Sequence, residues 1–211
     1  MAAKNDPVIT PGMDAQYLMR YQYLECIARI ARSKYVEQKR IETVHEACEK
    51  LITDCIIKNY TWEPWQDYRE NVLYVLEVDD VLKTNLEGIE KVMKAYHAPR
   101  KNYMNRKDFV SLVTRDSRVM IGEKEAIYCL SMSKMTVVLE TKTPKQYDII
   151  ALPEMCEALG RVADYKYRSQ TSLTIAQKIE LLLDDVFTFI NWKRKEVSQE
   201  IEEVSESDDE Y

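Results

Sequence analysis

Glycine and proline are scarce in this chain, and their scarcity constrains the fold more than any other feature of the sequence. The 211 residues include four glycines and six prolines, whereas sheet proteins need such turn residues every few positions. Apolar residues also recur at steps of three and four, as in Tyr21, Leu24, Ala28 and Ala31. This spacing places them on one face of a helix, so we expect a mostly helical protein.

The apolar periodicity divides the chain into helices separated by short polar gaps. A strand remains an alternative at "MTVVLE" because β-branched residues favour strands. Thr43 and Glu46 form a capping-box pattern at the start of the second helix. The expected helices cover about 14–35, 43–58 and 72–96, a short stretch around 109–113, a stretch from 122 to about 138, and a last stretch from 171 or 174 to 200.

Charge separates an acidic tail from a nearly neutral body. The whole chain has a net charge of −6, but the segment 196–211 holds eight acids and no Lys or Arg. Removing it leaves 30 basic and 28 acidic residues, without the broad basic stripe typical of nucleic-acid binding. The tail is expected to be a disordered solubilising segment or a regulated interaction segment.

We expect an N-terminal arm at 1–13, a helical repeat at 14–75, a pair of helix–loop–helix units with a last helix at 76–195, and the tail at 196–211.

Cysteine usage and hydropathy bear on the compartment. The five cysteines are scattered and form no C-x-x-C pair, which favours a reduced, intracellular protein with mostly buried thiols. No apolar run approaches the roughly 20 residues that span a bilayer, and no N-terminal run resembles a signal peptide. We therefore expect a cytoplasmic protein that does not enter a membrane.

One helical segment occurs twice. "YLECIARIARSKY" at 23–35 matches "MCEALGRVADYKY" at 155–167 at an offset of 132. The following helices match at an offset of 131, where "ACEKLITDCI" answers "KIELLLDDVF". Two amphipathic helices can share such residues by chance, but the repeated order of helix, polar gap and helix favours a duplication.

Two stretches have the frame of an EF-hand loop, in which an apolar residue occupies position 8 and an acid occupies position 12. A loop counted from His97 has Met104 at position 8 and Asp108 at position 12. A loop counted from Thr143 has Ile150 and Glu154 at these positions. In paired loops the position-8 residues join in a short antiparallel bridge, so we expect Met104 to pair with Ile150.

The calcium-binding positions of both loops hold unsuitable residues. Calcium prefers six to eight oxygen ligands, which an EF-hand takes from positions 1, 3, 5, 7, 9 and 12. Here His97 and Lys101 occupy positions 1 and 5 of the first loop, and Thr143 and Lys145 occupy positions 1 and 3 of the second. An ammonium group repels a cation. We therefore predict no calcium binding, no other metal site and no cofactor.

The two loop frames resemble the EF-hand superfamily over about residues 86–168. The repeated helices "YLECIARIARSKY" and "MCEALGRVADYKY" are similar to helices of divergent EF-hand proteins of cilia and flagella, although Tyr23 and Met155 replace the usual Phe. The resemblance implies an all-α fold of EF-hand-like paired units with extra flanking helices and at most a two-stranded β bridge. It also implies a non-catalytic structural or adaptor protein of the axonemal cytoskeleton, associated with doublet microtubules, with tubulin and axonemal proteins as candidate partners.

Two groups of residues are candidates for binding such partners. The first loop is basic around Tyr103, which indicates either a solvated turn or a patch for an acidic protein surface. Methionine lines adaptable grooves, although each methionine could equally belong to the core. We expect apolar grooves where the paired helix–loop–helix units stay open, and these would receive helices of neighbouring proteins. The candidates are Arg100, Lys101, Tyr103, Arg106 and Lys107 in the basic loop, Met132, Met135 and Met155 along the grooves, and Trp192, with Tyr103, as an anchor.

Catalytic motifs are missing from the sequence. It contains no phosphate-binding glycine loop, no H-E-x-x-H and no G-x-S-x-G. His45 and Cys48 are three positions apart on a helix, but a surface histidine beside a buried thiol explains them better than a catalytic pair does. We expect a binding protein rather than an enzyme. The alternatives are a calcium sensor or buffer and an enzyme with an unrecognised helical site.

Overall fold

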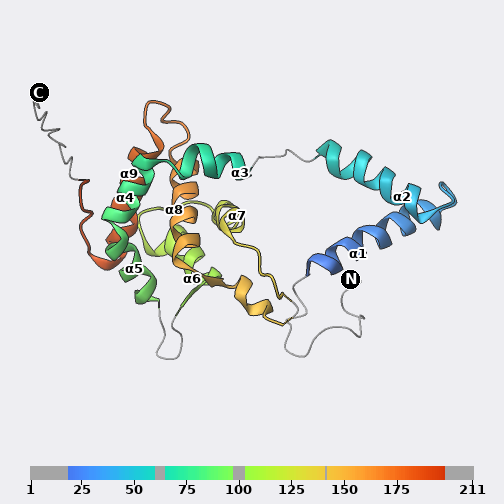
Figure 1. Cartoon of the computed structure of the whole chain (residues 1–211), viewed down its shortest axis with the longest axis horizontal. Coiled ribbons are helices and arrows are strands. Elements are labelled where there is room, and N and C mark those ends of the chain that lie inside the picture. Colours follow the sequence, from blue (N-terminus) through green and yellow to red (C-terminus); the bar gives the residue numbers. More distant parts are fainter. Residues whose placement is uncertain (1–18, 60–64, 97–102, 141, 198–211) are drawn as a thin grey trace, which may run out of the picture. The chain divides into compact units, whose positions relative to one another are not determined.

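Helices dominate the computed structural model, which describes residues 19–59, 65–96, 103–140 and 142–197 (Figure 1). Within these ranges, β structure is limited to the paired strands β1 (Met104–Asn105) and β2 (Ile149–Ile150), so the expected all-α fold is confirmed. The α-helices are α1 (Arg20–Ala31), α2 (Val44–Leu51), α3 (Trp65–Tyr68), α4 (Leu76–Thr84), α5 (Leu86–Ala95), α6 (Arg106–Ser111), α7 (Glu123–Ser133), α8 (Leu152–Lys166) and α9 (Ile175–Phe187).

Several of these helices continue into a wider or tighter turn. Among the described residues, π-helical turns extend four helices, and 3-10 turns occur at three places. The π-helical turns are Arg32–Val36 after α1, Ile52–Ile56 after α2, Arg69–Leu73 after α3 and Leu112–Asp116 after α6; the 3-10 turns are Ile57–Asn59, Pro144–Tyr147 and Thr188–Ile190.

The described residues form two units. Unit 1 contains residues 19–59 and the segment 136–147, and unit 2 contains 65–135 and 148–197, apart from the gaps given above. The boundary thus falls before α3, not at residue 75 as the sequence suggested. Arg69 accounts for this difference because its guanidinium Nε lies 2.9 Å from Glu157 of α8 in the middle of unit 2.

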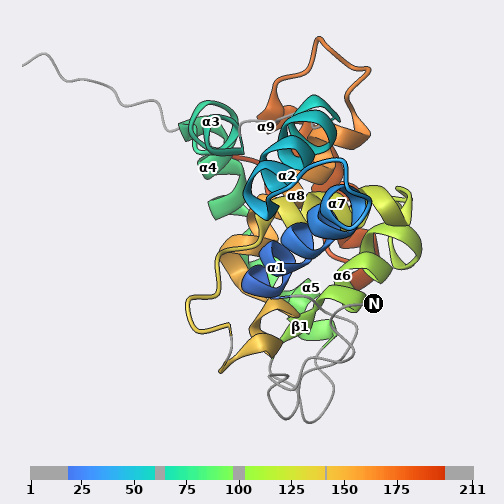
Figure 2. The ribbon, with the colours of Figure 1, turned by 90° about the vertical axis from the view of Figure 1, so that its right-hand side faces the viewer.

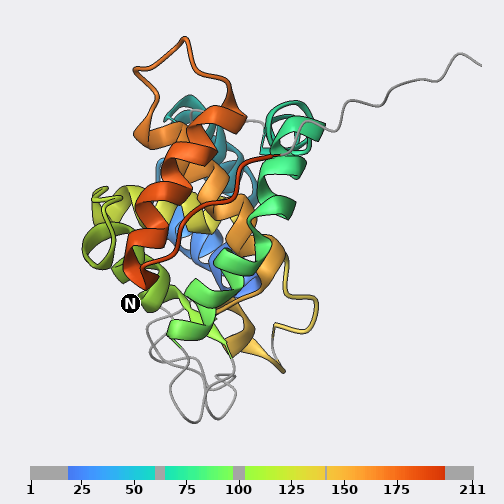
Figure 3. The same ribbon diagram turned by 90° about the vertical axis from the view of Figure 1, so that its left-hand side faces the viewer.

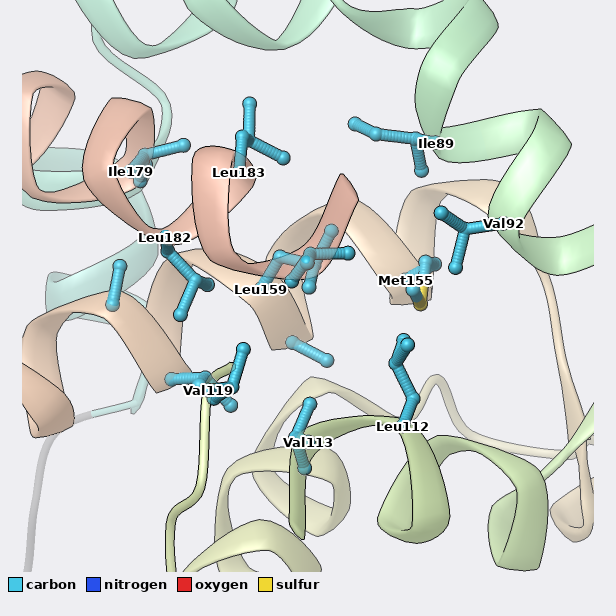
Figure 4. Packing of buried hydrophobic residues seen from close by; sticks show 14 of the residues in the cluster. Ile89, Val92, Leu112, Val113, Val119, Met155, Leu159, Ile179, Leu182 and Leu183 are labelled. Carbon is cyan, nitrogen blue, oxygen red and sulfur yellow. The ribbon is translucent and has the colours of Figure 1, made fainter. Parts of the chain in front are cut away.

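The core of unit 2 surrounds α8 and α9. Side chains from α5, the π-helical turn after α6, α8 and α9 converge there (Figure 4). Burying one such aliphatic side chain stabilises the fold by roughly 1.5–3 kcal/mol, so this cluster is the main apolar contribution to the stability of unit 2. Its largest fully buried members are Phe109, Phe187, Ile89, Met104, Leu112, Leu130, Ile150, Met155, Leu159, Ile179, Leu182 and Leu183.

The predicted bridge between the two loops is confirmed. β1 and β2 pair in antiparallel fashion, with Met104 opposite Ile150. Met104 is fully buried and Ile150 is 2% exposed, so the bridge is part of the core. It joins two helix–loop–helix segments, α5 to α6 and α7 to α8.

Unit 1 is a helical hairpin with a small core. α1 and α2 lie side by side (Figure 2). Their buried core residues are Ala31, Tyr35, Ala47 and Leu51. The predicted cap of α2 is present, because the Glu46 N–H donates to Thr43 Oγ1 over 3.2 Å. The segment 136–147 joins this unit through Arg20, whose Nε lies 3.0 Å from Glu140.

The helix expected over 72–96 is broken at Asn85, which separates α4 from α5. Asn85 is 1% exposed, and its side-chain amide donates to Val81 O over 3.0 Å. The same amide group pairs with the backbone of Lys195, accepting from its N–H (2.8 Å) and donating to its C=O (3.0 Å). The Asn85 side chain thus bonds both to α4 and to the C-terminal segment at Lys195. It lies where the helix is interrupted and holds the C-terminal segment in place.

The last helix is therefore shorter than expected. It ends at Phe187 with one further 3-10 turn, and Asn191 adopts a left-handed conformation with φ 50°. Beyond it the chain runs extended towards α4 and α5, where Asn85 binds Lys195 (Figure 3). The prediction of helix as far as residue 200 is wrong for residues 191–197. Residues 198–200 lie outside the described part.

Two further boundaries differ from expectation. α7 ends at Ser133, so Met135 and Val138 are not helical, and the segment 135–140 contains no strand among its described residues. Val138 is 84% exposed, so its side chain contributes little to the core. The expected helix start at Asp14, the arm at 1–13 and nearly all of the acidic tail lie outside the described residues.

The repeat found in the sequence is matched by the helix starts. α1 begins at Arg20 and α8 at Leu152, while α2 begins at Val44 and α9 at Ile175, in keeping with the two offsets of the repeat. The first helices also start with the same contact: the Met19 N–H donates to Gln22 Oε1 (3.0 Å), and the Ala151 N–H donates to Glu154 Oε2 (2.9 Å). Duplication remains a prediction, but the two helical pairs begin where it requires.

Candidate functional site

The candidate site is the end of the second loop, where β2 leads into α8. Glu154 is the third residue of α8, and its carboxylate accepts the backbone N–H of Ala151 over 2.9 Å. Pro153 lies in the first turn of the helix, where its missing N–H is not needed. A carboxylate is also favourable at this helix end because the helix dipole is positive there. These local effects fix the position of Glu154.

Lys134 supplies the counter-charge for Glu154. Its Nζ lies 2.8 Å from Glu154 Oε2 and donates to the carbonyl oxygen of Ile149 over 2.5 Å. The Met135 N–H donates to the other carboxylate oxygen over 2.9 Å. The side chains of Lys134 and Glu154 are 13% and 6% exposed, so both charges are largely removed from water and depend on these contacts.

The contacts of Lys134 coincide with two calcium-ligand positions of the EF-hand frame. Counted from Thr143, Ile149 is position 7, whose backbone carbonyl binds calcium in an EF-hand, and Glu154 is position 12, whose carboxylate does so. The Lys134 ammonium contacts both oxygens. A calcium ion does not fit this arrangement, because the two oxygens already bind a positive group. Among the described residues, no cluster of three or more His, Cys, Asp or Glu side chains could hold a metal ion.

The position-12 acid of the first loop, Asp108, likewise forms hydrogen bonds within the protein. Asp108 Oδ2 accepts the Asn105 N–H (3.1 Å), and Asn105 Oδ1 accepts the Asp108 N–H (3.0 Å). The Arg106 N–H donates to Asp148 O over 2.9 Å, which adds a bond beside the bridge. The loop residues His97, Arg100 and Lys101 lie outside the described residues.

The remaining candidate residues differ in their exposure to solvent. Tyr103 and Met135 are 36% and 50% exposed, Lys107 is also exposed, and Met132 is half-buried. Met155 is fully buried, so its proposed place in a partner groove is wrong because the core of unit 2 fills around it.

Trp192 and the start of the second loop are involved in contacts within their own units. Trp192 is half-buried against the core of unit 2, and Lys91 Nζ lies 3.3 Å from its ring centroid. It therefore anchors the C-terminal segment and is not an exposed anchor for a partner. Thr143 donates its hydroxyl to Leu139 O over 3.1 Å within unit 1, and Lys145 is exposed.

A second buried ion cluster centres on Glu157 of α8. Its carboxylate accepts Arg69 Nε (2.9 Å), Arg161 (3.0 Å) and the Tyr74 hydroxyl (3.3 Å). The Glu157 side chain is 3% exposed, and that of Arg161 is 6% exposed. The cluster joins α8 to the segment 69–74 within unit 2. No pattern in the sequence indicates Arg69, because it is remote from Glu157 along the chain.

A tyrosine and an aspartate extend this cluster along α8. The Tyr68 hydroxyl donates to Asp164 Oδ2 over 3.1 Å, and Lys178 Nζ lies 2.8 Å from Asp164 Oδ1. Burial, together with the nearby Asp164 charge, raises the pKa of Tyr68. The phenol is therefore a stable donor, and this arrangement ties α3 to α8 and α8 to α9.

No protein-family model, curated protein or solved structure matches this chain. Its class follows from the fold alone: a helical chain with two helix–loop–helix segments joined by the Met104–Ile150 bridge. None of the helices in the described ranges is both long and apolar enough to cross a membrane.

Proposed function

We propose that this chain is a non-catalytic structural or adaptor protein of a cytoskeletal assembly, built from EF-hand-like units that work without calcium. On the resemblance of its repeated helices, the assembly is the axonemal doublet microtubule of a cilium or flagellum. The proposed activity is the binding of neighbouring proteins, and the partners are tubulin and axonemal proteins.

The observation that carries this proposal is the contact of Lys134 with Glu154 and Ile149 O. A calcium sensor changes shape because its loop oxygens gain and lose a metal ion. In this chain a covalently attached ammonium group contacts those oxygens, so the end of the loop is held in one geometry. A fixed geometry suits a permanent component of an assembly better than a switch.

The buried cluster around Glu157 supports the same proposal. Perturbed or clustered ionisable groups can also mark an active site. Here, however, the carboxylate accepts two guanidinium groups and a phenol and is 3% exposed. These contacts join α8 to the segment 69–74, which is the role of a structural junction.

Proximity labelling in ciliated cells tests the proposal. A labelling enzyme fused to the full chain should label tubulin and known axonemal proteins above a control in which the enzyme is expressed alone. Extraction of axonemes in high salt should leave much of the chain in the insoluble doublet fraction. Recovery of the chain as a free cytosolic monomer without such labelling would contradict the proposal.

A further inference from the structure

The two copies of the repeated helical pair differ in how much of their surface is covered. Val162 of α8 is fully buried, whereas its counterpart in α1, Ile30, is 54% exposed. The side chain of Glu157 is 3% exposed, whereas that of its counterpart Glu25 is 44% exposed. α1 therefore has the residues of a packed helix without the elements that pack on α8.

Unit 2 shows which kind of element covers the Glu157 side of α8. The segment that runs from α3 into the following π-helical turn lies there. Its Arg69 Nε donates to Glu157 over 2.9 Å, and Leu73 approaches Gly160 so closely that a Cβ built there would lie 2.6 Å from Leu73 Cδ2. A helical turn that carries an arginine thus packs against this side of α8.

The corresponding side of α1 also has a glutamate beside a small residue, but here the glutamate and its apolar neighbours are exposed. Glu25 and Ala28 are the counterparts of Glu157 and Gly160 at the offset of 132. Leu24, next to them, is 66% exposed, and Tyr21, one turn before Glu25, is 37% exposed. These four residues lie on one side of the helix. We refer to Tyr21, Leu24, Glu25 and Ala28 as the α1 surface.

We propose that the α1 surface binds a helical segment of a neighbouring protein that presents an arginine to Glu25. This inference rests on the proposed function, since both require a protein partner, and it adds the surface and the chemistry of that partner. Charge complementarity selects the arginine, as it does at Arg69 and Glu157. The exposed Leu24 and Tyr21 supply apolar contact area.

The alanine at position 28 adds a size restriction. In unit 2, Leu73 fits because residue 160 has no Cβ. Ala28 has a Cβ at the equivalent place, so a leucine in the same position would meet it at much less than contact distance. The partner is therefore expected to carry a small residue, such as alanine, four positions after its arginine.

Synthetic peptides derived from residues 65–75 provide a defined probe. Gln66 lies 2.7 Å from Glu70 in this segment, so Gln66→Lys allows a lactam link to Glu70 that reduces the ordering cost on binding. The test peptide also carries Leu73→Ala. One control peptide retains Leu73, and a second carries Arg69→Glu together with Leu73→Ala.

Binding is followed by two-dimensional NMR of the isotope-labelled full chain. We expect the test peptide to cause saturable shifts of the Leu24, Glu25 and Ala28 amide signals. Affinity should be lower by about tenfold for the Arg69→Glu peptide and for a chain with Glu25→Lys, as expected for a lost charge pair. The Leu73 peptide should also bind more weakly than the test peptide.

Two results would overturn the proposal. One is the absence of saturable shifts on α1 at millimolar test peptide, and the other is equal affinity of the test and Arg69→Glu peptides. Such a failure would leave the adaptor function intact if proximity labelling still recovered axonemal proteins. Peptide binding by a chain that is a free monomer in cells would support the surface and contradict the adaptor function.

Discussion

Lys134 Nζ lies 2.8 Å from Glu154 Oε2, the carboxylate at position 12 of the loop frame counted from Thr143. The ammonium also binds Ile149 O, so one side chain contacts both the position-7 and the position-12 oxygens. Lys134, which follows the last residue of α7, thus supplies the positive charge beside Glu154. This contact holds the end of the loop frame, from Ile149 to Glu154, within unit 2.

Replacement of Lys134 should destabilise unit 2. Lys134→Gln leaves the buried Glu154 carboxylate without its charged partner, and breaking a largely buried pair costs about 3 kcal/mol. The free energy of unfolding is measured by urea denaturation of the full chain. Lys83→Gln, which removes the exposed pair with Asp79, is the matched control and should leave the stability almost unchanged, because exposed ion pairs contribute little. Equal effects of the two substitutions would contradict the role assigned to Lys134.

The repeated Glu–Arg pair offers a comparison within one chain. Glu25 and Glu157 each pair with an arginine four positions later. The second pair is buried with Arg69, so Glu157→Gln should cost about 3 kcal/mol, whereas Glu25→Gln should cost less than about 0.5 kcal/mol. Thermal unfolding of both variants decides the matter, and a small effect of Glu157→Gln would show that the buried cluster contributes little.

We expect that Leu73 can pack against α8 only because residue 160 is a glycine. Alanine is a better helix former by about 1 kcal/mol, but its Cβ would lie 2.6 Å from Leu73 Cδ2. Gly160→Ala should therefore lower the stability by about 1–2 kcal/mol despite the gain in propensity. In the double variant with Leu73→Ala the clash disappears, so the two changes should cost at least about 1 kcal/mol less than their sum. Simple additivity in urea denaturation would argue against this contact.

Cys156 should be slow to alkylate. Burial raises the pKa of its thiol to about 11, so at pH 8 only about 0.1% is thiolate, compared with about a quarter for an ordinary cysteine of pKa about 8.5. Because the raised pKa keeps the group protonated, its alkylation rate should rise about tenfold per pH unit between 8 and 10. Mass spectrometry of iodoacetamide-treated native protein measures this rate. A rate at pH 8 equal to that of an unstructured cysteine peptide would contradict the assigned environment.

Much of the fold could be predicted because it depends on local signals. Scarce glycine and helical periodicity predicted the all-α class, and the loop frame predicted the pairing of Met104 with Ile150. The repeat predicted matched helices, and α1 and α8, like α2 and α9, do start at the offsets of the repeat. Each of these depends on spacing along the chain, which the sequence contains directly.

The missed features depend on partners far away in the sequence. Asn85 breaks a helix because it binds Lys195, which lies near the other end of the described chain. Met155 is in the core and not in a groove because the helices around it close over it. Lys134 was not a candidate, since nothing in its own neighbourhood indicates that the chain folds back to bring Glu154 beside it.

Calcium titration of the full chain tests the central claim most directly. Unfolding temperature is measured in 1 mM calcium and in the presence of a calcium chelator, with isothermal calorimetry on the same sample. A site with a dissociation constant of about 1 μM would stabilise the fold by about 4 kcal/mol at this concentration, which corresponds to roughly 8–16 °C for a chain of this length. If the Lys134 ammonium takes the place of the ion, the unfolding temperature should not change and no binding heat should appear. A calcium-dependent rise of several degrees with stoichiometric binding would contradict the account.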